Sequence, residues 1–204
     1  MDWTSPGDWL LFLALMGALL LFRAWNTNRK MRPLRALFDG GQYERRGTGL
    51  IDTRYIGRYK GRRAAISYDP RGWGRPGNFD LEIACRAPWG FYARTLGREK
   101  IIGWSNTAGQ EVDLGDPGLA GKIGFYSDTP GELLRWLADP EARAAVAHWI
   151  LEEDAIYIAL RPSRRLGGRA LAVAYANTLP PRTEANVRVL MDRLDWLAGK
   201  AEGG

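Results

Sequence analysis

The sequence WLLFLALMGALLLF, residues 9–22, has no polar side chain, and the interpretation of the whole chain depends on it. As a helix it would be roughly 21 Å long, against about 30 Å for the hydrocarbon core of a bilayer. Trp3, Trp9 and Trp25 bracket the run, as aromatic side chains do at headgroup depth. Arg23 could extend its stem along lipid and place its charge at the interface. We therefore predict an N-terminal transmembrane anchor over residues 1–25, with anchor residues Trp9, Leu13, Leu20, Phe22, Arg23 and Trp25.

Two other interpretations of this run stay open. A cleaved signal peptide should begin with positive charge and end with small residues, yet Asp2 and Asp8 precede the run and RAWN follows it. A helix buried in a protein core could have the same length.

The charges that flank the run predict its orientation. The charged side chains before the run are the two aspartates, and after it comes a basic group: Arg29, Lys30, Arg32 and Arg35. Because basic flanks stay on the cytoplasmic side, we expect a single-pass protein of the inner membrane with its N-terminus outside and its soluble domain in the cytoplasm. The same group could also attract anionic headgroups, or do no more than set the topology.

The composition is that of one folded domain. Hydrophobic residues make up 46% and charged residues 25% of 204 positions. The net charge of +6 comes mostly from arginine. A compositional bias and the basic flank explain this charge, so nucleic acid is not an expected partner. Cys85 and His148 are the only residues of their types, which argues against a metal site, and we expect no cofactor.

Between the run and the domain, residues 26–49 are expected to form a basic connector. Met31, Leu34, Leu37 and Phe38 give it one apolar edge. That edge could lie on the bilayer surface or dock on the domain.

Residues 50–200 are predicted to be a soluble α+β domain. The segment FDLEIACR, residues 79–86, alternates apolar and polar side chains, which is typical of a strand with one buried face. Residues 55–59 and 64–68 suggest a hairpin around Lys60-Gly61. Further strands are expected at residues 91–96, 122–126, 156–160 and 170–174, with residues 103–121 as an irregular crossing.

Three helix starts can be read from the sequence. Thr129, Pro130 and Glu132 fit a capping box, and Asp139-Pro140 restarts the helix. Thr183 is expected to cap a last helix that closes at Gly199 and buries one stripe: Val187, Leu190, Met191, Leu194 and Leu197. The predicted fold class is therefore α+β, with one transmembrane helix followed by an antiparallel sheet covered by helices on one face.

No residue pattern points to a reaction. Residues 72–77 match G-x-G-x-x-G, but Pro76 removes a donor and a strand follows, so we interpret them as a hairpin loop. Asp80 and Glu82 share the polar face of one strand and are interpreted as solvated. Nothing brings Cys85 to His148 as a nucleophile and its base. We expect no catalytic residue and no enzymatic activity.

Two groups of residues suggest binding. The basic loop RPSRRLGGR could bind an anion through Arg161, Arg164, Arg165 and Arg169. Trp73 and Trp89 lie in glycine- or proline-flanked loops, where exposed tryptophan often anchors a protein partner or a membrane surface.

Two short motifs stand out: Gly57-Arg58-Tyr59-Lys60-Gly61-Arg62, within a strand pair, and Gly124-Phe125-Tyr126-Ser127-Asp128-Thr129-Pro130, between a strand and a helix. In these motifs the chain resembles a family of uncharacterised bacterial membrane-anchored proteins of unknown function. The resemblance covers roughly residues 50–198. It implies the same architecture and no mechanism.

The hypothesis drawn from the sequence is a non-catalytic, membrane-anchored interaction module. It would be an accessory or scaffold subunit whose partners are the bilayer and a membrane protein. The alternative is a membrane-tethered binder of anionic ligands, either lipid headgroups or nucleic acid, through the arginine-rich segments.

Overall fold

The structure is a computed structural model that describes residues 6–44, 54–69, 78–96, 109–176 and 183–203. Its helices are α1 (Pro6–Met31), the 3-10 helix η1 (Pro33–Leu37), α3 (Pro130–Leu137), α4 (Pro140–Leu151) and α5 (Glu184–Gly203). Its strands are β1 (Gly41–Glu44), β2 (Arg54–Tyr59), β3 (Arg62–Asp69), β4 (Asn78–Cys85), β5 (Phe91–Thr95), β6 (Gln110–Glu111), β7 (Ile123–Ser127), β8 (Ala155–Ser163) and β9 (Gly168–Ala176).

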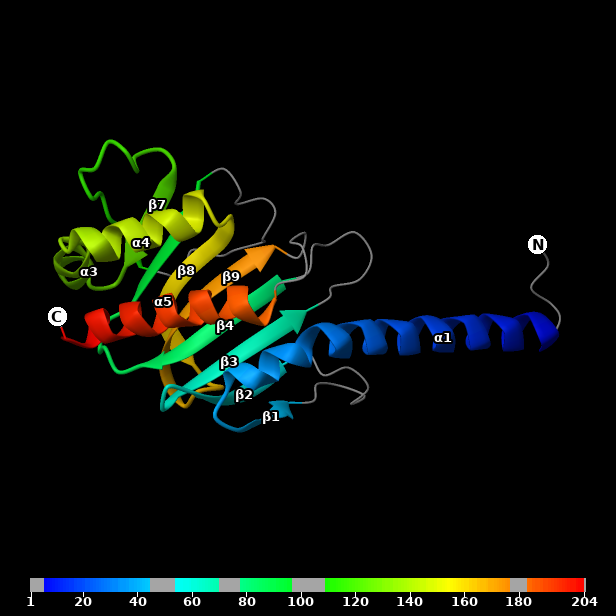
Figure 1. Cartoon of the computed structure of the whole chain (residues 1–204). Helices are drawn as coiled ribbons and strands as arrows, with labels where there is room; N and C mark the ends of the chain where they lie inside the picture. The colour runs from blue at the N-terminus through cyan, green and yellow to red at the C-terminus, as the bar shows by residue number, and fades with distance from the viewer. Residues whose placement is uncertain (1–5, 45–53, 70–77, 97–108, 177–182, 204) are drawn as a thin grey trace.

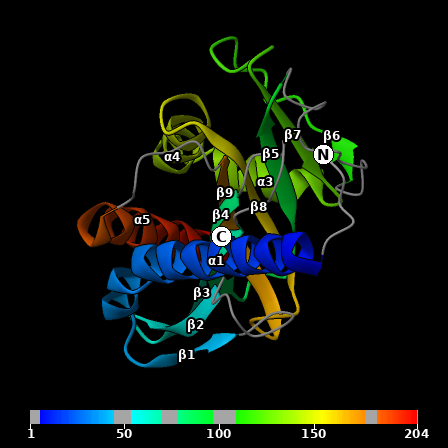
Figure 2. The ribbon, with the colours of Figure 1, turned by 90° about the vertical axis from the view of Figure 1, so that its right-hand side faces the viewer.

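The strands form one nine-stranded antiparallel sheet in the order β1-β2-β3-β4-β9-β8-β5-β7-β6. Helices α4 and α5 lie on one side of this sheet (Figure 1, Figure 2). α1 projects away from the sheet, and the first turn of this helix lies farthest from it (Figure 1). The order places β4 beside β9, although about 80 residues separate them in the chain.

The predicted transmembrane helix requires a correction. Among the residues that the structure describes, none of the helices combines the length and the apolar character that crossing a bilayer demands. α1 is 26 residues long, but its uninterrupted apolar run ends at Phe22 and is only roughly 21 Å long. This finding overturns the transmembrane part of the fold class, the single-pass signal anchor, and the inner-membrane location that was derived from them.

The hairpins follow the alternation in the sequence. β2 and β3 pair around Lys60 and Gly61, which both have positive φ, at 49° and 82°. Two consecutive positive φ values suit the right-handed twist of a two-residue hairpin. The predicted strands at residues 79–86, 91–96 and 122–126 and the later hairpin are confirmed. Of the predicted crossing, residues 103–108 lie outside the described residues, and β6 falls within the rest.

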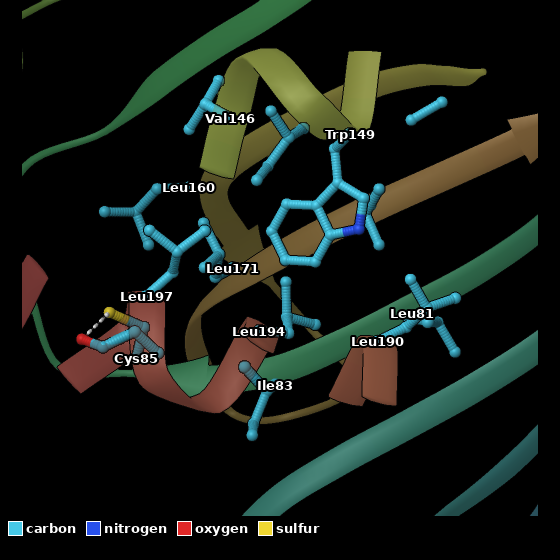
Figure 3. Packing of buried hydrophobic residues seen from close by; sticks show 14 of the residues in the cluster. Leu81, Ile83, Cys85, Val146, Trp149, Leu160, Leu171, Leu190, Leu194 and Leu197 are labelled. Atoms are coloured by element: carbon cyan, nitrogen blue, oxygen red, sulfur yellow. Dashed lines mark hydrogen bonds between the residues drawn. The ribbon is translucent and has the colours of Figure 1, made fainter. Parts of the chain in front are cut away.

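The core lies between the sheet and the helices on one face. Side chains at alternate positions of β4 point into it: Phe79, Leu81, Ile83 and Cys85. Figure 3 shows Trp149 of α4 and Leu194 of α5 in the same space as Leu81 and Ile83. Trp149 and Leu194 are fully buried. All five apolar residues predicted for the last helix are buried as well.

The helix caps agree with the sequence in part. Asp139 Oδ1 accepts hydrogen bonds from the amides of Glu141 and Ala142, so the predicted restart is confirmed. Thr183 Oγ1 accepts from the amide of Asn186. The capping box at Thr129 is wrong, because its side chain makes no cap bond and its own amide donates to Ser127 Oγ instead. The end at Gly199 is also wrong, since α5 continues to Gly203.

The connector is part of the domain. Its four apolar residues are buried in the same core as β4, and η1 packs against α5. Of the two arrangements left open, the structure therefore shows docking on the domain. β1, which follows, pairs with β2. The helix α1 runs through the expected boundary at residue 25 without a break.

We expect Leu194→Ala to lower the free energy of unfolding by about 3 kcal/mol, because a fully buried leucine loses its contacts and leaves a cavity. Val189→Ala on the same helix is the control. Val189 is 57% exposed, and the change should stay within about 0.5 kcal/mol. Urea titration followed by tryptophan fluorescence measures both variants. Equal losses in the two would contradict this account of the core.

Candidate functional site

From Trp9 to Phe22 the surface of α1 is apolar on all sides. Its exposed large side chains lie between 40% and 68% exposed and are Trp9, Leu10, Leu11, Phe12, Leu13, Leu15, Met16, Leu19, Leu20, Leu21, Phe22 and Trp25. Helices that are apolar all round are normally enclosed by other apolar groups. Contiguous apolar surface beyond a few hundred Å² usually marks an interaction site. α1 is therefore the first candidate site.

The base of α1 is held to the domain. Met31, its last residue, is 1% exposed and belongs to the core. Pro33 then starts η1, whose Leu34 and Leu37 are buried. Near the base, the guanidinium of Arg29 lies 5.3 Å from the ring centre of Trp25. Whatever covers α1 is thus coupled to the domain through a packed joint.

The second candidate lies on the sheet face opposite the helices. There the carboxylate of Glu82, with a side chain only 4% exposed, accepts hydrogen bonds from three groups of the β8–β9 hairpin. Arg161 Nη2 and Arg165 Nη1 donate to its Oε1 over 3.2 and 3.1 Å. Ser163 Oγ donates to Oε2 over 2.9 Å. We call these four residues the Glu82 cluster. Since Glu82 is buried and paired, its interpretation as a solvated residue is corrected.

Small side chains make this contact across β9 possible. Glu82 pairs in register with Ala172 of β9, and Arg161 of β8 pairs with Ala170. Both alanines are buried and leave room above β9 for the long side chain of Arg161. The sequence signal was the alternation that places Glu82 on this face. The sequence did not indicate that β4, β9 and β8 are neighbours in the sheet.

Asp80 lies two residues before Glu82 on the same face. Its Oδ2 accepts from Ser67 Oγ over 3.3 Å, while its buried Oδ1 has no partner among the described residues. Burial, and next the negative charge of Glu82, raise the pKa of Asp80 to about 6. The positive charges of Arg161 and Arg165 oppose that rise in pKa. A carboxyl group with this pKa changes charge near neutral pH.

The structure separates the four arginines of the predicted anion-binding loop. Arg161 and Arg165 turn inward to Glu82, and Arg161 also donates to Tyr157 Oη over 3.3 Å. Arg164 is exposed, and Arg169, which pairs in register with Pro162 next to the turn, has its side chain against Gly90. An anion would therefore compete with Glu82 for two of the four guanidinium groups.

The other predicted residues lie as follows. Trp89 is 6% exposed and packs against Phe91 and Trp136, with ring centres 5.8 and 5.5 Å away, so its expected exposure is corrected. Trp73 lies outside the described residues. Of the basic flank, Arg29, Arg32 and Arg35 are exposed, and Arg35 lies 5.5 Å from the ring centre of Tyr43. The side chains of Arg23 and Lys30 are not among those described.

Cys85 and His148 have separate partners. The thiol of Cys85 contacts the carbonyl oxygen of Ala198 at 3.6 Å within the core. His148 Nδ1 lies 2.8 Å from Glu152, and its Nε2 lies 3.6 Å from Glu153. Within the described ranges, no three His, Cys, Asp or Glu side chains gather to hold a metal ion.

Comparison with known proteins yields one distant structural likeness. A crystal structure of the mycobacterial trehalose monomycolate transport factor A, TtfA, aligns with a TM-score of 0.49 and 12% sequence identity. The alignment covers 87% of this chain and 92% of that one. No protein-family model and no curated protein matches the sequence. So distant a likeness carries no inference about what the chain does.

We expect Glu82→Gln to lower the free energy of unfolding by about 2 kcal/mol, because two arginines lose their shared buried counter-charge. The value is below that of a fully buried pair because both arginines are partly exposed. Glu132→Gln is the matched control, since its pair with Arg135 is exposed and should contribute about 0.5 kcal/mol or less. Thermal and urea unfolding measure both. An unchanged stability in Glu82→Gln would contradict a structural role for the cluster.

The raised pKa of Asp80 predicts a pH-dependent stability. The folded state holds the Asp80 proton more tightly than the unfolded state, whose pKa is the ordinary 3.8. This contribution is fully present below about pH 4 and is lost as the pH rises through about 6. Asp80→Asn, neutral at every pH, should match the wild type at pH 4 and exceed it by about 2 kcal/mol at pH 8.

The control for this pH dependence is Asp128→Asn, at an exposed position. This change replaces one exposed side chain and should keep the free energy of unfolding within about 0.5 kcal/mol of the wild type. Urea titrations at the two pH values suffice. A stability difference for Asp80→Asn that does not change with pH would show that the carboxyl group titrates normally.

Proposed function

We propose that this chain is a non-catalytic accessory subunit that assembles with a partner protein by burying α1 among apolar helices of that partner. The observation that carries the proposal is the all-round exposure of large apolar side chains on α1. Covering one leucine of this kind contributes roughly 1.5–3 kcal/mol. Because the domain leaves these side chains exposed, a partner that covers them would gain this free energy of association.

The distribution of these side chains indicates the kind of partner. They occupy nearly every position from Trp9 to Phe22, not a single stripe. A single groove covers one side of a helix, so several partner helices are needed to enclose this surface. Membrane proteins, the partner class expected from the sequence, have helices with apolar surfaces of this type.

The packed joint at Met31 would connect the domain firmly to the partner. Because Met31 and η1 are packed into the core, the domain would be held at a defined position relative to the partner. The three α-helices of the domain and its antiparallel sheet would then serve as a rigid platform for further contacts. This is the role of a scaffold subunit.

The proposal is tested with the double variant Leu13→Gln/Leu20→Gln, which leaves the domain untouched. The wild-type chain, expressed at its natural level and purified in mild detergent, should carry a partner in stoichiometric amount. The variant should retain at least tenfold less of it, because two exposed leucines of α1 no longer contribute apolar contact. Mass spectrometry with quantification measures both.

The matched control is Leu134→Gln/Val189→Gln, which changes two exposed apolar residues of α3 and α5 and should keep the partner. A photo-crosslinker placed at Leu13 should join α1 to an apolar helix of the partner. A chain that purifies alone, a crosslink to a polar surface, or tight binding to protein-free vesicles without a partner would each overturn the proposal.

A further inference from the structure

A pocket of about 330 Å³ lies next to β7, and the described residues that line it include none from α1 or from the Glu82 cluster. Its floor is apolar and consists of Val112, Leu119, Ile123 and Phe125, which are all buried. Leu96 and Leu114 line it as well. A volume of this size is at the low end for binding pockets and holds one or two side chains.

The walls of this pocket are held in place by the backbone of the chain. The amide of Val112 donates to the carbonyl oxygen of Phe125 over 2.8 Å, and the amide of Ile123 donates to that of Leu119 over 3.1 Å. The turn between these walls passes through Gly121, whose φ of +71° is rarely adopted by other residues. The pocket is therefore formed before any ligand enters.

The rim of the pocket is acidic. Glu111, Asp113 and Asp116 belong to it, and no lysine or arginine is found among the described residues that line it. The amides of Gly115 and Gly118 donate to Asp113 Oδ1 and Asp116 Oδ1, each over 2.8 Å. These bonds fix two of the carboxylates beside the opening.

Among the described residues, a cation of α4 approaches this rim. Arg143 Nη1 of α4 lies 3.7 Å from Asp116 Oδ2, which is a long and partly exposed contact. Three carboxylates against one arginine leave a negative rim on a chain whose net charge is +6. An apolar floor with a negative rim is complementary to an apolar side chain with positive neighbours.

We propose that this pocket docks a segment of a partner protein in which one leucine- or phenylalanine-sized side chain is flanked by lysine or arginine. The apolar side chain enters between Leu119 and Phe125, and the flanking cations meet Glu111, Asp113 and Asp116. This contact is separate from the one proposed for α1, and either can exist without the other.

The test uses the full chain, labelled with ¹⁵N in a nonionic detergent, and the acetylated pentapeptide GKLKG. Its addition should shift the amide signals of Gly115, Gly118 and Gly121, which border the pocket. The peptides GELEG and GKSKG, which lack the positive charges or the apolar side chain, should leave these signals unchanged. Raising the salt concentration should weaken the binding of GKLKG.

The triple variant Glu111→Gln/Asp113→Asn/Asp116→Asn removes the charge and keeps an oxygen for the amides of Gly115 and Gly118. Its affinity for GKLKG should fall about tenfold, since each exposed ion pair contributes little by itself. The control variant Glu132→Gln/Glu141→Gln/Glu152→Gln removes three negative charges from α3, from α4 and from the C-cap of α4. It should bind GKLKG as the wild type does.

Three results would overturn the proposal. They are no shift with GKLKG, equal shifts with GELEG or GKSKG, and undiminished binding by the triple variant. The co-purification of a partner through α1 is measured separately, so failure of one proposal is distinguishable from failure of the other.

Discussion

The alternation of side chains along β4 is the constraint on which the rest of this structure depends. Leu81 and Ile83 face α4 and α5 and form the centre of the core, while Glu82 between them faces the other side. A shift of one residue in register would exchange these faces and bury a carboxylate against Trp149. Because β4 lies between β3 and β9, the same register also aligns both halves of the sheet.

On the opposite face of the sheet, a buried carboxylate pairs with part of the arginine charge of this basic chain. Glu82 pairs with two arginines of the β8–β9 hairpin and balances one of their two charges, and Leu166 at the hairpin tip packs on Ala65 and Ala170. The arginine-rich hairpin thus connects the neighbouring strands β4, β9 and β8 through side-chain contacts. The cost of burying Glu82 is offset by three hydrogen bonds to its two oxygens.

The two proposed contacts use different physical interactions. From Trp9 to Phe22, α1 carries apolar surface and would supply free energy of association by burial, with little dependence on salt. The pocket beside β7 combines a small apolar floor with an acidic rim and would select its ligand by charge. A subunit with both kinds of contact could hold one partner firmly while it binds a second segment weakly.

The sequence by itself determined the features that depend on neighbours in the chain: the strand at residues 79–86, the hairpin turn at Lys60-Gly61, the cap at Asp139 and the buried stripe of α5. Period and turn chemistry are local properties, so they can be read from residues a few positions apart. Only the tertiary structure decided that Glu82 meets Arg161, that Trp89 is buried, and that the run in α1 stands exposed. Those outcomes depend on which strands lie side by side and on what surrounds a helix. They are set by contacts between residues far apart in the chain, such as Glu82 and Arg161, which are 79 positions apart.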